Sequence, residues 1–140
     1  MSKSFIKFRS GYKYQLASDF QIKITIKPKI DIDDKYIKID KKGNMTIIAG
    51  YAWDGPSGPV PDTNENMRAS LVHDALYQLM RHKYLKVRES RNKADKLFMK
   101  MCIEDGVPRR TAKFYYIGLK TFGKPNADPK KIKKIYKAPA

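Results

Sequence analysis

The chain has few of the residues that brace or anchor small proteins. It holds one cysteine, Cys102, and two histidines among 140 residues, so it can form no internal disulfide, and we expect no structural zinc site. Its apolar runs fall far short of the ~20 residues that cross a bilayer, and segment 1–9 alternates charged with apolar residues. These absences predict no transmembrane segment and no signal peptide. They indicate a protein kept in a reducing cytoplasm, or one that leaves it by a route other than secretion.

Acidic residues are also scarce. The chain has 30 Lys+Arg against 14 Asp+Glu, which gives a net charge of +16. Such a field favours polyanions such as nucleic acid, anionic lipid headgroups or an acidic protein surface, and charge alone does not choose among them. No known nucleic-acid-binding motif accompanies the charge. The candidate polyanion-binding residues gather near the C-terminus: Arg109, Arg110, Lys113, Lys130, Lys131, Lys133 and Lys134.

Apolar residues, by contrast, make up 41% of the chain, enough for the core of one domain. Residues 20–26 alternate apolar and polar side chains, which is typical of a half-buried strand. Residues 36–40 and 45–49 flank a short turn, and this predicts a hairpin with Gly43 in a left-handed conformation. A further short strand is expected at 12–16. The first half of the chain therefore predicts antiparallel strands.

A stiff loop separates these strands from the second half. Residues 54–63 contain three prolines and two glycines, which exclude a helix or a regular strand. A first helix is expected to begin near Asp62 or Thr63, where Asp62-x-x-Glu65 resembles a capping box, and to end near His82.

Two more helices and a basic tail complete the expected fold. The second helix spans about 90–105 and buries Cys102, and the third follows Pro108 and ends at Phe122. Six lysines and three prolines in 124–140 predict an extended or partly disordered tail. The chain is thus predicted to be one α+β domain with a basic tail. Its expected parts are a domain over 1–123, with strands at about 12–53, the loop at 54–63 and helices at about 64–122, and a tail over 124–140.

The chemistry that the sequence offers is centred on His73 and Asp74. His73 and Tyr77 are four residues apart on the first helix and so share a face. The link to the second helix is short, so we expect the two helices to pack antiparallel and Asp95 to meet His73 across their interface. A carboxylate there would orient the imidazole and raise its basicity. Asp74 would point to one side, towards the loop.

The loop and Asp74 together suggest a calcium site. Calcium binds carbonyl and carboxylate oxygens, and glycines and prolines expose backbone carbonyls in fixed directions. A water held by His73 beside such a cation is the machinery of metal-assisted ester hydrolysis. The candidate metal ligands are Asp54, Gly55, Ser57, Gly58 and Asp74.

Two segments carry a resemblance to secreted phospholipases A2. Their calcium loop and catalytic helix resemble Tyr51-x-x-x-Gly55-x-x-Gly58-x-x-Pro61-Asp62 and His73-Asp74-x-x-Tyr77. The resemblance implies that His73 is the general base, that Asp74 binds calcium, and that Tyr77 and Asp95 hold the histidine. The chain lacks the disulfides of that family, and Leu76 replaces its cysteine before the tyrosine.

A more extensive resemblance is to a family of unknown function that is common in tailed phages and prophages. It rests on three motifs: G-x-x-x-D-G-x-S-x-P at 50–59, A-x-x-x-H-D-x-L-Y at 69–77 and A-D-x-x-F at 94–98. This resemblance implies a phage origin, with the protein in the host cytoplasm or in the virion, and it supplies no activity.

Three functions follow as hypotheses. The first is a phage-encoded protein with a phospholipase A2-like site, which hydrolyses lipid esters with calcium or descends from such an enzyme. Its partner would be an anionic membrane lipid. The second is a head, neck or tail component of the virion, in which the histidine and aspartate only pack the core and the partners are virion proteins. The third is a basic protein that binds nucleic acid through its tail.

Overall fold

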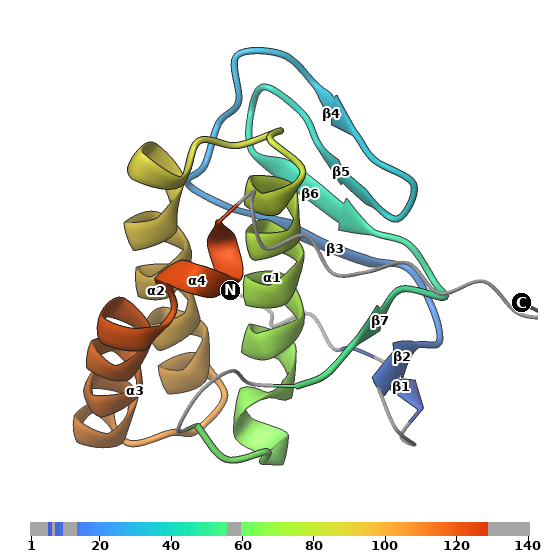
Figure 1. Cartoon of the computed structure of the whole chain (residues 1–140). Coiled ribbons are helices and arrows are strands. Elements are labelled where there is room, and N and C mark those ends of the chain that lie inside the picture. The colour runs from blue at the N-terminus through green and yellow to red at the C-terminus, as the bar shows by residue number, and fades with distance from the viewer. Residues whose placement is uncertain (1–5, 7, 10–13, 56–59, 129–140) are drawn as a thin grey trace, which may run out of the picture.

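The computed structural model describes residues 6, 8–9, 14–55 and 60–128. Within these residues seven short strands are followed by four helices (Figure 1). This α+β arrangement, with antiparallel strands first and helices after them, confirms the predicted fold class.

The strands form two small antiparallel sheets. One sheet has the order β1-β2-β7 and the other has the order β3-β6-β5-β4. Pairs such as Tyr14 with Trp53 and Phe20 with Ile47 set their registers. The strand bounds are Phe8–Arg9 for β1, Tyr14–Leu16 for β2, Phe20–Lys23 for β3, Ile32–Asp33 for β4, Ile37–Ile39 for β5, Asn44–Ile47 for β6 and Ala52–Trp53 for β7.

The predicted hairpin is present as β5 and β6. Asp40 closes its turn, because its carboxylate accepts hydrogen bonds from the backbone N–H groups of Lys42 and Asn44 and from the Asn44 side chain. Gly43 has a φ of +89°, and a Cβ atom there would lie 2.4 Å from the carbonyl oxygen of Ile24. Only glycine meets both conditions without strain, so the predicted left-handed position is confirmed.

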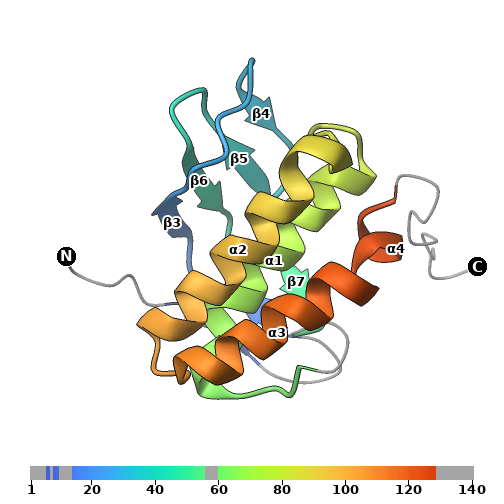
Figure 2. The same ribbon diagram turned by 90° about the vertical axis from the view of Figure 1, so that its left-hand side faces the viewer.

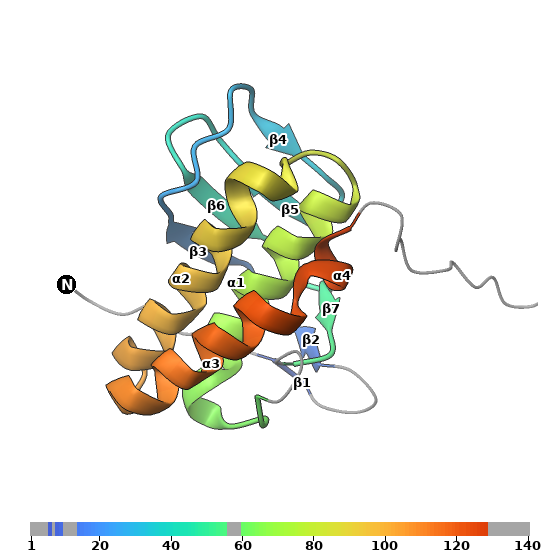
Figure 3. The same ribbon diagram turned by 60° about the vertical axis from the view of Figure 1, so that its left-hand side comes forward.

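The first helix, α1, spans Asn64–Arg81 and is the central element of the fold. It lies between the strands and the layer formed by α2 and α3 (Figures 2 and 3). Thirteen of its 18 residues are buried, so it is covered on nearly every side. None of the helices in the described parts of the chain is long and apolar enough to cross a membrane.

The start of α1 corrects the predicted cap. The N-cap is Thr63, and its backbone N–H donates to the side-chain oxygen of Asn66 at 3.1 Å. The capping box therefore begins one residue later than Asp62-x-x-Glu65. Asp62 instead accepts a hydrogen bond from the Tyr14 hydroxyl at 2.7 Å, so a contact with the first sheet takes its carboxylate away from the helix.

The other long helices, α2 at Val87–Glu104 and α3 at Arg109–Phe122, lie close to their expected positions. Helix α2 begins three residues before the expected Ser90. It buries Cys102 completely, as predicted.

A fourth helix, α4 at Lys124–Ala127, replaces the start of the expected extended tail. The prediction is wrong here because Pro125 suits a first helical turn, and because the side chain of Ala127 is fully buried. The segment packs against α1 and α3, and so belongs to the folded unit. Residues 129–140 of the predicted tail lie outside the described residues.

Candidate functional site

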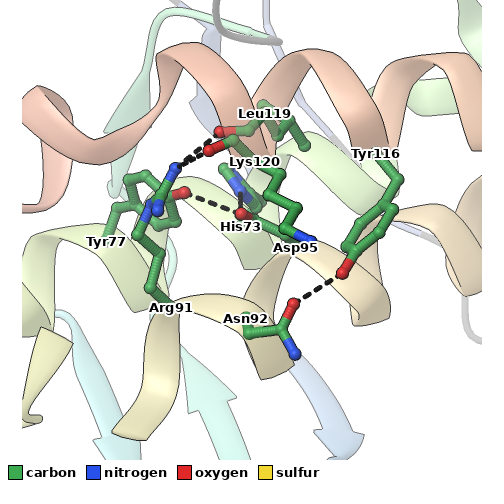
Figure 4. Close-up of polar contacts among 8 residues, drawn as sticks. All are labelled: His73, Tyr77, Arg91, Asn92, Asp95, Tyr116, Leu119 and Lys120. Carbon is green, nitrogen blue, oxygen red and sulfur yellow. Dashed lines mark hydrogen bonds and ion pairs between the residues drawn. The ribbon is translucent and has the colours of Figure 1, made fainter. Parts of the chain in front are cut away.

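The predicted contact between the first two helices is confirmed. His73 on α1 places Nε2 2.7 Å from Oδ1 of Asp95 on α2. The hydroxyl of Tyr77, one turn after His73, donates to the same Asp95 oxygen at 2.6 Å (Figure 4). We call His73, Tyr77 and Asp95 the His73 cluster.

The His73 cluster lies in the core. The exposed fractions are 2% for His73, 2% for Tyr77 and 1% for Asp95. The His73 ring stacks on Tyr77, with 4.2 Å between centroids, and meets the Phe98 ring edge-on at 5.3 Å. Ring packing and the bond to Asp95 together fix the orientation of the imidazole.

This geometry assigns different tasks to the two nitrogens of His73. A carboxylate against Nε2 keeps the proton of the neutral ring on that nitrogen, which leaves Nδ1 with the lone pair that can accept a proton. Burial raises the pKa of Tyr77, and the negative charge of Asp95 raises it further. Tyr77 therefore stays protonated and serves as a donor. The cluster can hold a histidine as a general base, with Nδ1 as its reacting atom.

The end of α3 lies against this cluster. Arg91 of α2 donates from one guanidinium nitrogen to the carbonyl oxygens of Leu119 at 2.9 Å and Lys120 at 2.6 Å (Figure 4). Gly123 follows, and a Cβ atom there would lie 2.8 Å from the Tyr77 hydroxyl oxygen. The sequence analysis missed Arg91, although its place four residues before Asp95 on one helix face is a signal that could have found it.

Asp74 lies on a different side of α1 from His73. It is half-buried, and its charge acts on Tyr51. Burial raises the pKa of Tyr51 above its usual range, and the charges of Asp74 and, more weakly, Asp54 raise it further, against the opposing effect of Arg81. The charges of both predicted ligands, Asp74 and Asp54, thus act on the same buried tyrosine.

Of the remaining predicted calcium ligands, only one lies within the described residues. Gly55 is described and has a φ of +87°, whereas Ser57 and Gly58 lie outside the described residues. Among the described residues no group of three or more His, Cys, Asp or Glu side chains could hold a metal ion. A calcium site can instead be made mainly of backbone carbonyl oxygens with one or two carboxylates, and such a site needs no cluster of three side chains. Asp74 and Asp54 carry oxygen donors of the type that calcium prefers.

The predicted polyanion-binding residues fall into two groups. Arg109, Arg110 and Lys113 are exposed in the first turns of α3. The others, Lys130, Lys131, Lys133 and Lys134, lie outside the described residues.

Comparison with known families gives one match. Residues 30–119 match the family described as "Protein of unknown function (DUF1353)", and the matched segment contains the whole His73 cluster. The match covers more than half of the chain, so the chain belongs to this family. The comparisons with curated proteins and with solved structures gave no match.

Proposed function

We propose that this chain is a phage-encoded hydrolase of lipid esters, with a site of the phospholipase A2 type. One observation carries the proposal: Asp95 Oδ1 receives both His73 Nε2 at 2.7 Å and the Tyr77 hydroxyl at 2.6 Å. A carboxylate and a hydroxyl that together fix one imidazole are what a general base needs, because orientation and tautomer decide whether it can take a proton from water.

In this proposal the residues have separate roles. His73 Nδ1 takes a proton from water, and Asp95 and Tyr77 position the ring. Asp74 and Asp54, with loop carbonyls, would hold calcium, and the bound ion would offset the negative charge that develops on the carbonyl oxygen of the ester. The resemblance of the loop and helix to secreted phospholipases A2 supports these roles, and the resemblance to phage proteins supports the source.

One observation favours a second candidate, a structural component of the virion. All three side chains of the His73 cluster are 2% exposed or less. A buried and hydrogen-bonded polar group also fixes how two helices pack. In this candidate the cluster sets the α1–α2 interface and has no substrate.

An assay of fatty acid release from anionic phospholipid vesicles separates the two candidates. The wild type should release fatty acid with millimolar calcium and should stop when calcium is chelated. His73→Gln keeps a polar side chain but removes the base, so its rate should fall by about a hundredfold or more. Asp74→Asn should lose activity and calcium dependence together.

Matched controls make this assay specific. His82→Gln changes the chain's other histidine, which lies 3.4 Å from Asp34 and outside the cluster. Asp33→Asn changes an exposed carboxylate. Both controls should keep wild-type activity, and melting curves should show that every variant is folded. A wild type without calcium-dependent release, or His73→Gln as active as His82→Gln, would contradict the hydrolase and leave the structural candidate.

A further inference from the structure

The outward face of α3 exposes large apolar side chains. On this face Phe114 is 64% exposed and Ile117 is 51% exposed, and Phe122, the last residue of the helix, is 67% exposed. Single exposed apolar residues are common on protein surfaces, but here three lie on one helix of 14 residues. The face therefore calls for an explanation beyond chance exposure.

The packing of α3 shows that this face is set by the fold. Ala112, Tyr115 and Leu119 are buried on the opposite side of the helix. The Tyr116 hydroxyl donates to the Asn92 side chain of α2 at 2.6 Å, which fixes the rotation of the helix. In Figures 2 and 3 no described element lies over the outer side of α3. Phe114 and Ile117 must then point away from the domain.

The charge around these residues has one sign. Residues 106–127 contain five basic side chains and no acidic one. All five are exposed; four lie on α3 and the fifth begins α4: Arg109, Arg110, Lys113, Lys120 and Lys124. A surface of this kind attracts a negatively charged partner and repels a second copy of itself.

We propose that this face of α3 docks on the surface of an anionic lipid bilayer. A helix that combines aromatic and aliphatic side chains with Lys and Arg lies in the interface, with its apolar groups below the headgroups and its cations against lipid phosphates. The exposed side chain of Ile117 argues against nucleic acid as the partner. It has no π face to stack on a base, and its burial against a phosphate backbone would gain little. Phe114 and Phe122 gain most from an apolar phase.

This inference deepens the proposed function, because it names the surface through which a lipid hydrolase would reach its substrate. It concerns binding alone and can be measured without turnover. Vesicle flotation with calcium chelated reports docking, whereas fatty acid release reports hydrolysis, so either proposal can fail while the other stands.

The test uses the full chain and vesicles of phosphatidylcholine, with or without phosphatidylglycerol. The wild type should bind the anionic vesicles and only weakly the neutral ones. Phe114→Ser combined with Ile117→Ser should weaken binding to anionic vesicles by about tenfold or more, because two apolar anchors are lost. Lys113→Glu should weaken it by at least about fivefold, and most at low salt.

A matched control uses two large exposed apolar residues from elsewhere in the described part of the chain. Ile30 is 73% exposed and Tyr84 is 46% exposed, and both lie outside α3. Ile30→Ser combined with Tyr84→Ser removes similar apolar surface and should leave vesicle binding unchanged.

Three outcomes would overturn the proposal. The α3 double variant could bind anionic vesicles as well as this control does, which would show that vesicle binding depends on net charge and not on the apolar residues of α3. The wild type could bind duplex DNA tightly and vesicles poorly, with Lys113→Glu weakening the DNA complex, which would make the face a nucleic-acid surface. Light scattering could show a wild-type dimer that the α3 double variant dissolves, which would make it a self-association surface.

Discussion

Removal of one oxygen atom by Tyr77→Phe tests the His73 cluster directly. The Tyr77 hydroxyl is buried and donates to Asp95 Oδ1 at 2.6 Å. A hydrogen bond to a charged group contributes about 1.5–3 kcal/mol to stability. The phenyl ring of the variant still stacks on His73, whose centroid lies 4.2 Å away in the wild type, so little apolar packing is lost. We expect a cost of about 2 kcal/mol, or a melting temperature lower by roughly 6 °C.

Urea or thermal unfolding measures this cost, and Tyr51→Phe is the matched control. Tyr51 is 4% exposed, so it is as buried as Tyr77, but its hydroxyl lies 3.5 Å from the Gln78 side-chain oxygen. So long a contact contributes little, and we expect a change below about 0.5 kcal/mol. The substitution is chemically the same at both sites, so the difference between them measures what the Tyr77 hydroxyl contributes through its polar partners.

A double-mutant cycle shows whether the charge of Asp95 matters. In the Asp95→Asn background the acceptor is neutral, so Tyr77→Phe should cost only about 1 kcal/mol or less. The reasoning that the Tyr77 hydroxyl stabilises the fold through the charge of Asp95 would be refuted by either of two results. Tyr77→Phe and Tyr51→Phe could lower the free energy of unfolding equally, or Tyr77→Phe could cost as much in the Asp95→Asn background as in the wild type. The hydroxyl would then contribute nothing through Asp95.

Two further predictions concern the surroundings of the cluster. Gly123→Ala should lower stability by about 1–3 kcal/mol, measured by thermal unfolding, because the added Cβ would lie 2.6 Å from the carbonyl oxygen of Leu119 and 2.8 Å from the Tyr77 hydroxyl oxygen, while the φ of −80° at Gly123 strains no side chain. Burial raises the pKa of Cys102 from 9.0 to about 12, so folding favours the neutral thiol. The contribution of this thiol to the free energy of unfolding is therefore complete below pH 9.0 and falls as the pH rises towards 12. The stability advantage of the wild type over Cys102→Ala should therefore shrink across this range in urea unfolding, and a constant difference would contradict the shift.

The sequence predicted the features that depend on local pattern. Alternation of polar and apolar residues located the hairpin, and its turn required a residue that tolerates the +89° φ of Gly43. Helical spacing placed His73 and Tyr77 on one face, and a short connection brought Asp95 opposite them. These inferences succeed because a few neighbouring residues determine the backbone there.

The features that the sequence did not predict depend on distant contacts. Asp62 is a good N-cap by residue type, but its carboxylate accepts the hydroxyl of Tyr14, which is 48 residues away in sequence. The helix at Lys124–Ala127 looks like part of a charged tail until the burial of Ala127 against the domain is known. Arg91 likewise gains its role only when α3 ends beside it. Local spacing marks the helix face of such a residue, as it does for Arg91, but it does not report the distant partner.

The burial of the three polar side chains of the His73 cluster raises the question of what they contribute to the protein. Apolar residues of similar volume in place of a buried ionic group are often neutral or stabilising, so stability alone does not require a histidine, a tyrosine and an aspartate among neighbours such as Phe98. What the three provide, and apolar residues cannot, is a fixed tautomer and a fixed ring orientation. A base depends on both, and a buried hydrogen-bonded group that fixes the packing of two helices uses the fixed orientation as well. The bonds from His73 and Tyr77 to one oxygen of Asp95 serve either candidate, and the activity of His73→Gln is the measurement that decides between them.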